Sequence, residues 1–149
     1  MEARFEMFTG LIAKASRCIH KIKSEEMAEH DLKSSHVSCL YYLYKANAPL
    51  TAKELCDLCE EDKANISRAI KYLETEGYVA CQSTAQKRYL SPLLLTEAGK
   101  NVGKDLAEKI DKVLVDASHG LTEENRMIFY QSLSLICENL EKICEQYGE

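Results

Sequence analysis

The stretch from residue 50 to residue 99 constrains the fold most, because its apolar and turn-forming residues fit two short helices followed by a β-hairpin. Thr51 and Glu54 have the spacing of a capping box, in which each side chain satisfies a free backbone amide of the first helical turn. A helix is therefore expected to begin at about Thr51. The polar run at residues 60–62 ends this helix and predicts a turn.

A second helix is expected between Asp62 and Gly77. Asp62 is a suitable N-cap because its short carboxylate accepts hydrogen bonds from first-turn amides, and Gly77 fits the left-handed position that ends a helix. Apolar residues at i, i+3, i+4 and i+7 predict one buried face, formed by Ile66, Ala69, Ile70 and Leu73. The opposite face carries Lys63, Asn65, Ser67, Arg68 and Lys71.

The polar face of the second helix has the side-chain types that read DNA. Arginine and lysine pair with guanine edges or phosphates, asparagine pairs with adenine, and small residues let a helix approach the groove. A solvated amphipathic helix accounts equally well for this face when the helix is considered alone. The residues expected to contact DNA here are Thr51, Lys63, Ala64, Asn65, Ser67, Arg68 and Lys71, with Arg68 and Asn65 on base edges.

A β-hairpin is expected after Gly77, with a polar tip at residues 83–88 between two β-rich runs. Lys87 and Arg88 in this tip suit a minor groove or its phosphates, and both are expected to contact DNA. Pro92 has no amide donor and should occupy an edge or a bulge. A hairpin in this place favours DNA binding over the solvated-helix interpretation.

Short sequence signatures recur in the expected order through this region. They are a Leu-Thr helix start, Asp-Lys and Ser-Arg pairs in the second helix, a Leu-Glu-x-x-Gly exit and a Leu-Thr-x-x-Gly start to the next helix. The residues that form them are Leu50, Thr51, Asp62, Lys63, Ser67, Arg68, Leu73, Glu74, Gly77, Leu95, Thr96 and Gly99. In this combination the chain resembles the MarR family of bacterial winged-helix transcription regulators. The resemblance implies a mainly α fold, a winged helix-turn-helix with a β-hairpin wing and N- and C-terminal dimerisation helices.

The wing motif departs from the family pattern. Where the family has Asp-Arg-Arg, this chain has Lys87, Arg88 and Tyr89, so only Arg88 is retained. In the family the aspartate holds the arginine side chain by a local ion pair. Lys87 therefore removes the orienting partner expected for Arg88.

The charge of the chain is unevenly distributed. The formal net charge is −5, which by itself argues against a nucleic-acid partner, because phosphate neutralisation supplies much of the affinity. Residues 62–91, however, carry five cations and three anions, leaving −7 for the rest. A local basic face on an acidic body is compatible with DNA binding that weakens with salt.

Both ends of the chain carry apolar residues at heptad spacing, which is typical of helices that pack against other helices. Alternatively, each end could pack on its own domain. Two such stripes favour an intermolecular helix bundle instead, and the family resemblance also implies a homodimer. The expected dimer interface is Phe5, Phe8, Ile12, Ile19, Phe129, Leu133, Ile136, Leu140 and Ile143. We expect one domain over residues 1–149, with a DNA-binding module at 34–95 and a dimerisation region at 1–31 and 97–149.

Three kinds of regulatory signal remain open. The resemblance implies a cleft for a small aromatic or anionic effector, which His36, Tyr41 and Tyr44 are placed to line, although both tyrosines also fit core packing. Cys18, flanked by basic residues, is a candidate for peroxide sensing, because some family members use a first-helix cysteine; burial is the alternative. Cys56 and Cys59 form a CxxC that core packing explains.

No cofactor or metal site is expected. The alternative is a zinc site whose ligands are His30, His36 and Glu26. Enzyme motifs such as a phosphate-binding glycine loop, a nucleophile elbow or HExxH are absent from the sequence, so catalysis is not expected. The longest apolar runs are short and the first ten residues are acidic where a signal peptide is basic, which predicts no membrane partner and a cytoplasmic location. Seven unevenly spaced cysteines then favour reduced thiols.

Taken together, these features predict a bacterial repressor that binds a pseudo-palindromic operator as a homodimer and is released by a small molecule. The alternatives are a thiol-based redox regulator that uses Cys18, and a winged helix that binds proteins and not double-stranded DNA.

Overall fold

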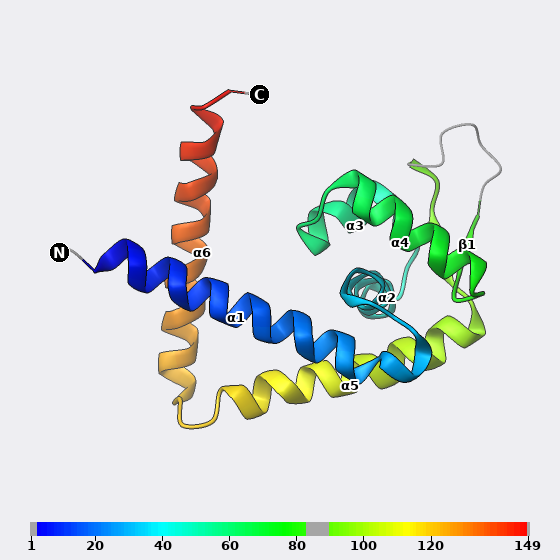
Figure 1. Ribbon diagram of the computed structural model, residues 1–149, viewed down its shortest axis with the longest axis horizontal. Helices are drawn as coiled ribbons and strands as arrows, with labels where there is room; N and C mark the ends of the chain where they lie inside the picture. The colour runs from blue at the N-terminus through cyan, green and yellow to red at the C-terminus, as the bar shows by residue number, and fades with distance from the viewer. Residues whose placement is uncertain (1–2, 83–89, 149) are drawn as a thin grey trace. The chain divides into compact units, whose positions relative to one another are not determined.

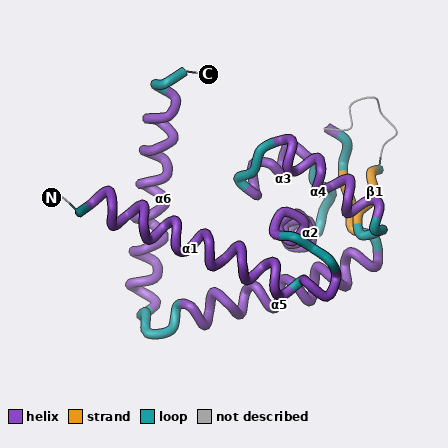
Figure 2. Tube along the Cα trace, viewed as in Figure 1, coloured by secondary structure: helices purple, strands orange, loops and turns teal. Residues whose placement is uncertain are grey.

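The computed structural model describes residues 3–82 and 90–148, and its helices and strands follow one another as shown in Figures 1 and 2. In chain order the elements of the described residues are α1 (Arg4–Glu26), the short 3-10 helix η1 (Ala28–His30), α2 (Ser34–Ala46), α3 (Ala52–Cys59), α4 (Lys63–Thr75), β1 (Val79–Cys81), β2 (Leu93–Leu95), α5 (Glu97–Ala117) and α6 (Glu123–Glu145). The expected mainly α winged-helix fold is confirmed.

The chain divides into two compact units, residues 1–111 and 112–149. The first unit contains the helix-turn-helix, the two strands and the buried core; the second contains α6. Among the described residues, no helix has the length and apolarity needed to cross a membrane.

Both predicted helix starts in the helix-turn-helix are confirmed. The Thr51 amide donates to Glu54 Oε2 at 2.7 Å, and the Glu54 amide donates to Thr51 Oγ1 at 3.2 Å, so the capping box is complete. Asp62 Oδ1 accepts from the Asn65 amide at 2.8 Å and caps α4. Gly77, with φ of +79°, follows the last turn of α4 as predicted.

The core lies where α2, α3 and α4 pack together and the two strands cover them. The predicted stripe of α4 is buried in it. Met27 and Leu32, which flank η1, are also buried, at 0% and 3% exposure, and periodicity does not predict them because they lie outside any regular stripe. Leu58 of α3 is 43% exposed, since Leu55 and the cysteines occupy the core side of this helix.

The hairpin pairs as an antiparallel ladder, with Val79 opposite Leu95 and Cys81 opposite Leu93. Pro92 lies just before β2, as its missing donor requires, and its carbonyl accepts from the Gln82 amide at 2.9 Å. Leu50 adds a bridge on the other side of Leu93, with backbone hydrogen bonds of 3.1 and 2.8 Å that were not predicted. The start of the helix-turn-helix is thereby joined to the wing.

The Leu-Thr-x-x-Gly signature fixes the start of α5 against the end of α4. The Thr96 hydroxyl donates to the Gly77 carbonyl at 2.6 Å and accepts from the Gly99 amide at 3.1 Å. A Cβ on Gly99 would lie 2.0 Å from the Tyr78 carbonyl oxygen. Only glycine therefore lets α5 approach the Tyr78 backbone this closely.

His36 links the start of α2 to α4. Its Nδ1 accepts a hydrogen bond from the Lys33 amide at 3.0 Å, and its ring stacks on Tyr72 of α4, with ring centroids 4.3 Å apart and planes within 5°. Burial, followed by the nearby charge of Lys33, lowers the pKa of His36, while Asp31 opposes this shift. Because Nδ1 is an acceptor here, the fold requires the neutral imidazole.

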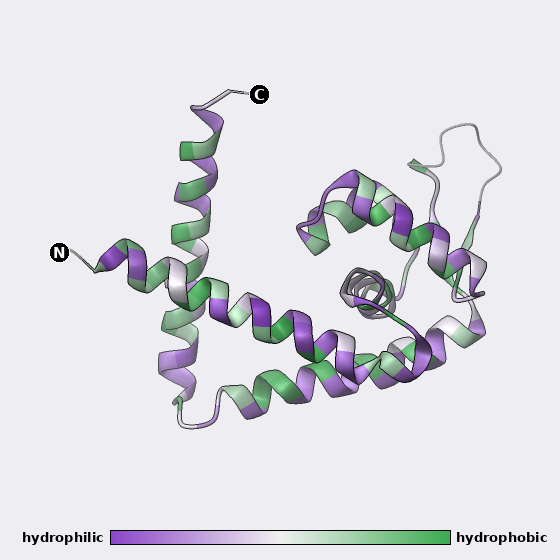
Figure 3. Cartoon of the chain, in the orientation of Figure 1, coloured by the Kyte–Doolittle hydropathy of each residue, from purple (hydrophilic) through white to green (hydrophobic). Residues whose placement is uncertain are grey.

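The terminal helices expose their apolar residues. No residue of α1 or of α6 is buried, and hydrophobic residues, green in Figure 3, recur along both helices. On α5, Leu106 is buried and Val102, Ile110 and Val113 are half-buried, whereas Ala117 is exposed. Gly103 and Ala107 complete the buried side of α5.

We expect Gly99→Ala to destabilise the protein by about 1–3 kcal/mol, because the new methyl group would force the start of α5 away from Tyr78. Gly10→Ala is the matched control. Gly10 lies in α1 with open space around it, so this change should stabilise the chain by about 0.5–1 kcal/mol. Urea unfolding of both variants measures the difference; equal stability would contradict the close approach.

The lowered pKa of His36 predicts that stability falls on acidification. The unfolded chain takes up a proton at about pH 6.5 and the folded chain only below that value, so the contribution of neutral His36 is complete above this range and is lost as the pH falls through the folded pKa. His36→Gln keeps an acceptor for the Lys33 amide but does not titrate. Urea unfolding between pH 8 and pH 5 should therefore show a smaller loss of stability for this variant.

The exposed His119 supplies the control for this comparison. His119→Gln should keep the pH dependence of the wild-type protein. If His36→Gln and the wild-type chain lose stability equally, His36 does not contribute to the acid sensitivity.

Candidate nucleic-acid interface

The exposed side of α4 presents a continuous polar ridge. Ile66 and Leu73 are fully buried, and at 3.6 residues per turn the opposite side of the helix must face solvent. The residues exposed there, called the α4 ridge below, are Ala64, Ser67, Arg68 and Lys71. All four are among the residues predicted to contact DNA.

A chain of hydrogen bonds holds Arg68 in place on this ridge. Asp62 Oδ2 accepts from the Asn65 side-chain amide at 3.3 Å, and Asn65 Oδ1 accepts from Arg68 Nη2. Each link joins residues three apart on one helical turn. The spacing of Asp62, Asn65 and Arg68 in the sequence is the signal that would have revealed this chain of contacts.

This arrangement gives the two predicted base-reading residues different states. The Arg68 guanidinium keeps further donors after its bond to Asn65, so it remains competent to bind guanine or phosphate. The Asn65 side chain is engaged on both its amide nitrogen and its oxygen. After these two bonds, one amide hydrogen and one oxygen lone pair of Asn65 are left for adenine.

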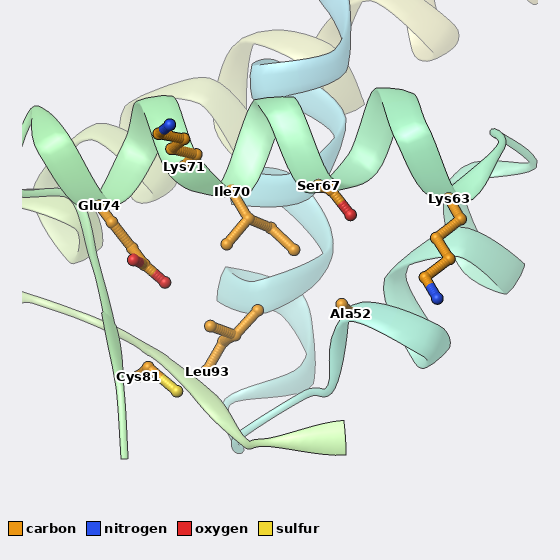
Figure 4. Close-up of a pocket in the computed structure, with 8 residues that line it drawn as sticks. All are labelled: Ala52, Lys63, Ser67, Ile70, Lys71, Glu74, Cys81 and Leu93. Atoms are coloured by element: carbon orange, nitrogen blue, oxygen red, sulfur yellow. The ribbon is translucent and has the colours of Figure 1, made fainter. Parts of the chain in front are cut away.

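One flank of α4 faces the strands across a pocket shown in Figure 4. Lys63, Ser67, Ile70 and Glu74 extend from α4 toward it, while Ala52 of α3, Cys81 of β1 and Leu93 of β2 line the other sides. This flank carries two cationic side chains, Lys63 and Lys71, and one anionic side chain, Glu74. The wing-side flank is thus basic where it meets the exposed ridge.

The other flank of α4 faces the start of α2. A second pocket there is lined by Asp31, Lys33, Ser35, His36, Asn65, Arg68, Ala69 and Tyr72. The Tyr72 hydroxyl donates to the Asp31 carbonyl at 2.8 Å, and this bond and the His36 stack fix the floor of the pocket. Sequence reasoning did not identify Tyr72, which lies at the edge of the apolar stripe.

The remaining predicted DNA contacts lie in two other places. Thr51 is half-buried at the start of α3, and its hydroxyl is already engaged with Glu54 in the cap. Lys87 and Arg88 lie outside the described residues.

The three candidate effector residues lie against different neighbours. His36 faces Tyr72, whereas the Tyr41 hydroxyl donates to Asp111 Oδ1 on α5 at 3.0 Å. Tyr44 packs next to Gly103 of α5, where an added Cβ would come within 3.0 Å of it. The contacts of His36 thus lead to α4, and those of the two tyrosines lead to α5.

Asp111 is the acceptor that ties α2 to α5. Lys45 Nζ lies 2.6 Å from Asp111 Oδ2, and the Tyr41 hydroxyl occupies the other oxygen. The hydrogen bond from Lys45, then that from Tyr41, lowers the pKa of Asp111. Burial and the same bond to Asp111 raise the pKa of Tyr41.

Cys18, the candidate redox residue, is exposed on α1. His30 and His36, which were considered together as possible zinc ligands, have different partners, since His30 contacts Glu29 and His36 contacts Tyr72. Among the described residues, one group brings three possible metal ligands together: Glu29, His30 and Asp105. The Lys109 ammonium lies 3.1 Å from Asp105 Oδ2 and 3.9 Å from Glu29 Oε1, so a cation is already present beside these carboxylates.

The residues predicted to form a dimer interface line both terminal helices. Phe8 and Leu133 are half-buried. The exposed ones are Phe5, Ile12, Ile19, Phe129, Ile136, Leu140 and Ile143.

Comparison with known proteins agrees with this arrangement. The sequence model of the MarR family matches residues 30–88, which include α2, α3, α4 and β1. The chain is also similar to the uncharacterized HTH-type transcriptional regulator YybA of Bacillus subtilis (strain 168). The two are 26% identical over 133 residues, which cover 89% of this chain and 86% of YybA.

Solved structures share the fold over nearly the whole chain. A MarR transcriptional regulator from Methanosarcina mazei Go1 superposes with a TM-score of 0.77 at 24% identity, covering 93% of this chain and 92% of that one. The MepR–DNA complex of S. aureus gives a TM-score of 0.78 at 17% identity, covering 89% of this chain and 96% of MepR. In its sequence over residues 30–88 and in its fold over nearly the whole chain, the protein is similar to the MarR family of transcriptional regulators.

Proposed function

We propose that the protein is a sequence-specific DNA-binding repressor that acts as a homodimer on a pseudo-palindromic operator and is released by a small molecule. The observation that carries this proposal is the α4 ridge, in which Arg68 is held by Asn65 on an exposed helix that is anchored by its opposite face. A rigid helix that displays a small residue, a hydroxyl and two cations fits the major groove. Arg68 is assigned to a base edge, and Lys63, Ser67 and Lys71 are assigned to bases or phosphates.

A relative supports the choice of DNA as the partner. The MepR structure that shares this fold is a complex with DNA. Residues 34–95 are therefore proposed as the DNA-binding module of this chain. Lys87 and Arg88 at the tip of the wing are proposed to add minor-groove or phosphate contacts.

The terminal helices support the homodimer. Phe5 on α1 is 78% exposed, and the seam of α6 exposes Phe129, Ile136, Leu140 and Ile143. Large apolar side chains at heptad spacing lose contact with water when a second helix covers them, which favours association. Residues 1–31 and 97–149 are proposed as the dimerisation region, with two-fold symmetry that matches a pseudo-palindrome.

The flank of α4 that faces α2 supports regulation by a small anion. Lys33, His36 and Arg68 line one pocket there, and an anion bound between them would compete with DNA for Arg68. Tyr41 and Tyr44 remain the candidates for an aromatic effector near α5. Binding in either place would bias the position of α4 or of α5, and so release the operator.

We expect Arg68→Ala to weaken specific operator binding by about 1–3 kcal/mol, because a base-edge contact is lost while the fold is unchanged. The operator is first selected from a random DNA pool with the reduced protein at moderate salt, and affinity is then measured by fluorescence anisotropy. Lys104→Ala, which removes an exposed cation from α5, is the matched control and should bind as tightly as the wild-type chain. Equal binding by the Arg68 variant, or selection of no sequence at all, would contradict the proposal.

We expect Leu140→Asp to give monomers or insoluble protein, because a charge would enter the proposed α6 seam. Gln131→Asp adds the same charge on the side of α6 away from the seam and should leave the dimer intact. Light scattering across a concentration series measures the mass of both variants. A stable Leu140→Asp dimer would refute the role of the seam.

A further inference from the structure

Three polar side chains at the start of α4 are connected by hydrogen bonds: Asp62, Asn65 and Arg68. One carboxylate oxygen of Asp62 caps the helix by accepting from the Asn65 backbone amide at 2.8 Å. The other oxygen accepts from the Asn65 side-chain amide at 3.3 Å. The residue that starts α4 therefore also holds the side chain that supports Arg68.

The side-chain amide of Asn65 has one orientation that satisfies both neighbours. Its nitrogen donates to Asp62 and its oxygen accepts from Arg68 Nη2. If the amide were turned over, its oxygen would face a carboxylate and its nitrogen would face a guanidinium, so both contacts would become repulsive. Asn65 is also half-buried, whereas Asp62 and Arg68 are exposed. The Asn65 side chain is thus fixed by two polar partners and by partial burial.

The bond to Asn65 leaves Arg68 with one complete set of paired donors. A guanidinium presents two forks of parallel N–H groups, one formed by Nη1 and Nη2 and the other by Nε and Nη2. Because the two hydrogens of Nη2 belong to different forks, the bond to Asn65 Oδ1 occupies one fork and leaves the other complete. A complete fork matches O6 and N7 of guanine, which lie side by side in the major groove.

The charges at the start of α4 favour a base over a phosphate as the partner of Arg68. Glu60, Glu61 and Asp62 outnumber Lys63 in this part of the sequence. Carboxylates repel the DNA backbone, so they weaken contacts to phosphate, which carry no sequence information. A guanine edge has no formal charge and is not repelled in this way.

We propose that Asp62 and Asn65 are positioning residues that set Arg68 for the recognition of one guanine in each operator half-site. Asp62 acts through Asn65, and Asn65 acts through the fork of Arg68 that it occupies. Restraining the guanidinium in the free protein reduces the side-chain entropy that is lost on binding. The inference rests on the proposed function, since it requires that α4 meets the bases of an operator.

Asp62→Asn is the variant that separates positioning from capping. Asparagine caps a helix as well as aspartate does, so its oxygen keeps the bond to the Asn65 backbone amide. Its nitrogen takes the place of the second carboxylate oxygen and cannot accept from the Asn65 side chain. Glu60→Gln is the matched control, because it removes the same charge just before Asp62 and leaves the three connected side chains unchanged.

The restraint on Arg68 is measured in the free protein, by NMR relaxation of its Nε–H group. We expect a high order parameter in the wild-type chain and in Glu60→Gln, and a low one in Asp62→Asn and Asn65→Ala. Circular dichroism checks that every variant keeps its helix content. Equal mobility of Arg68 in the wild-type chain and in Asn65→Ala would overturn the proposal, whatever the protein binds.

Base recognition is measured on the selected operator and on operators in which each base pair is changed in turn. The base pair that Arg68 reads is the one at which Arg68→Ala loses its preference. The wild-type chain should prefer guanine there by about tenfold. Asp62→Asn and Asn65→Ala should lose most of this preference at the same base pair, and Glu60→Gln should keep it.

Combining the two variants tests the order of the connection. Asp62→Asn together with Asn65→Ala should lose no more preference than Asn65→Ala alone, because Asp62 acts through Asn65. Additive losses would contradict this order and overturn the proposal.

The remaining outcomes separate this proposal from the proposed function. Full preference for the guanine in both single variants would overturn the positioning role. A loss in Asn65→Ala at an adenine instead would do the same, because Asn65 would then read a base itself. If the wild-type chain selects no operator, the proposed function fails, and the role in guanine recognition fails with it; the mobility of Arg68 still decides whether Asp62 and Asn65 restrain it.

Discussion

The packing of α4 against α2 and α3 is the contact on which the rest of the structure depends. Ile66, Leu73 and Leu40 are completely buried at this junction. Once the apolar stripe of α4 is fixed to the core, the helix cannot rotate, and its opposite side must face outward. The exposed position of Arg68 follows from this burial, and so does the division of α4 into a flank facing the strands and a flank facing α2.

Hydrogen bonds at helix ends complete the positioning that burial begins. Asp62 caps α4 and also binds the side chain of Asn65, which in turn accepts from Arg68, so the residue that starts the helix also orders its outer surface. At the other end, Gly77 accepts from Thr96 and brings α5 close. Because hydrogen bonds act only over short distances, a small displacement at either end of α4 changes the positions of the side chains on the α4 ridge.

The sequence by itself determined the elements, since capping boxes, helix-ending glycines and apolar spacing act over a few residues, and it correctly placed the starts of α3 and α4, the buried stripe of α4 and the hairpin. Only the tertiary structure decided which residues of different helices and strands face one another. The stack of His36 on Tyr72, the hydrogen bond of Tyr41 to Asp111 and the outward turn of Leu58 join or separate residues that no local period relates. Local patterns reflect backbone hydrogen bonding and helical phase, whereas such contacts depend on how whole helices pack, and only the folded chain fixes that packing.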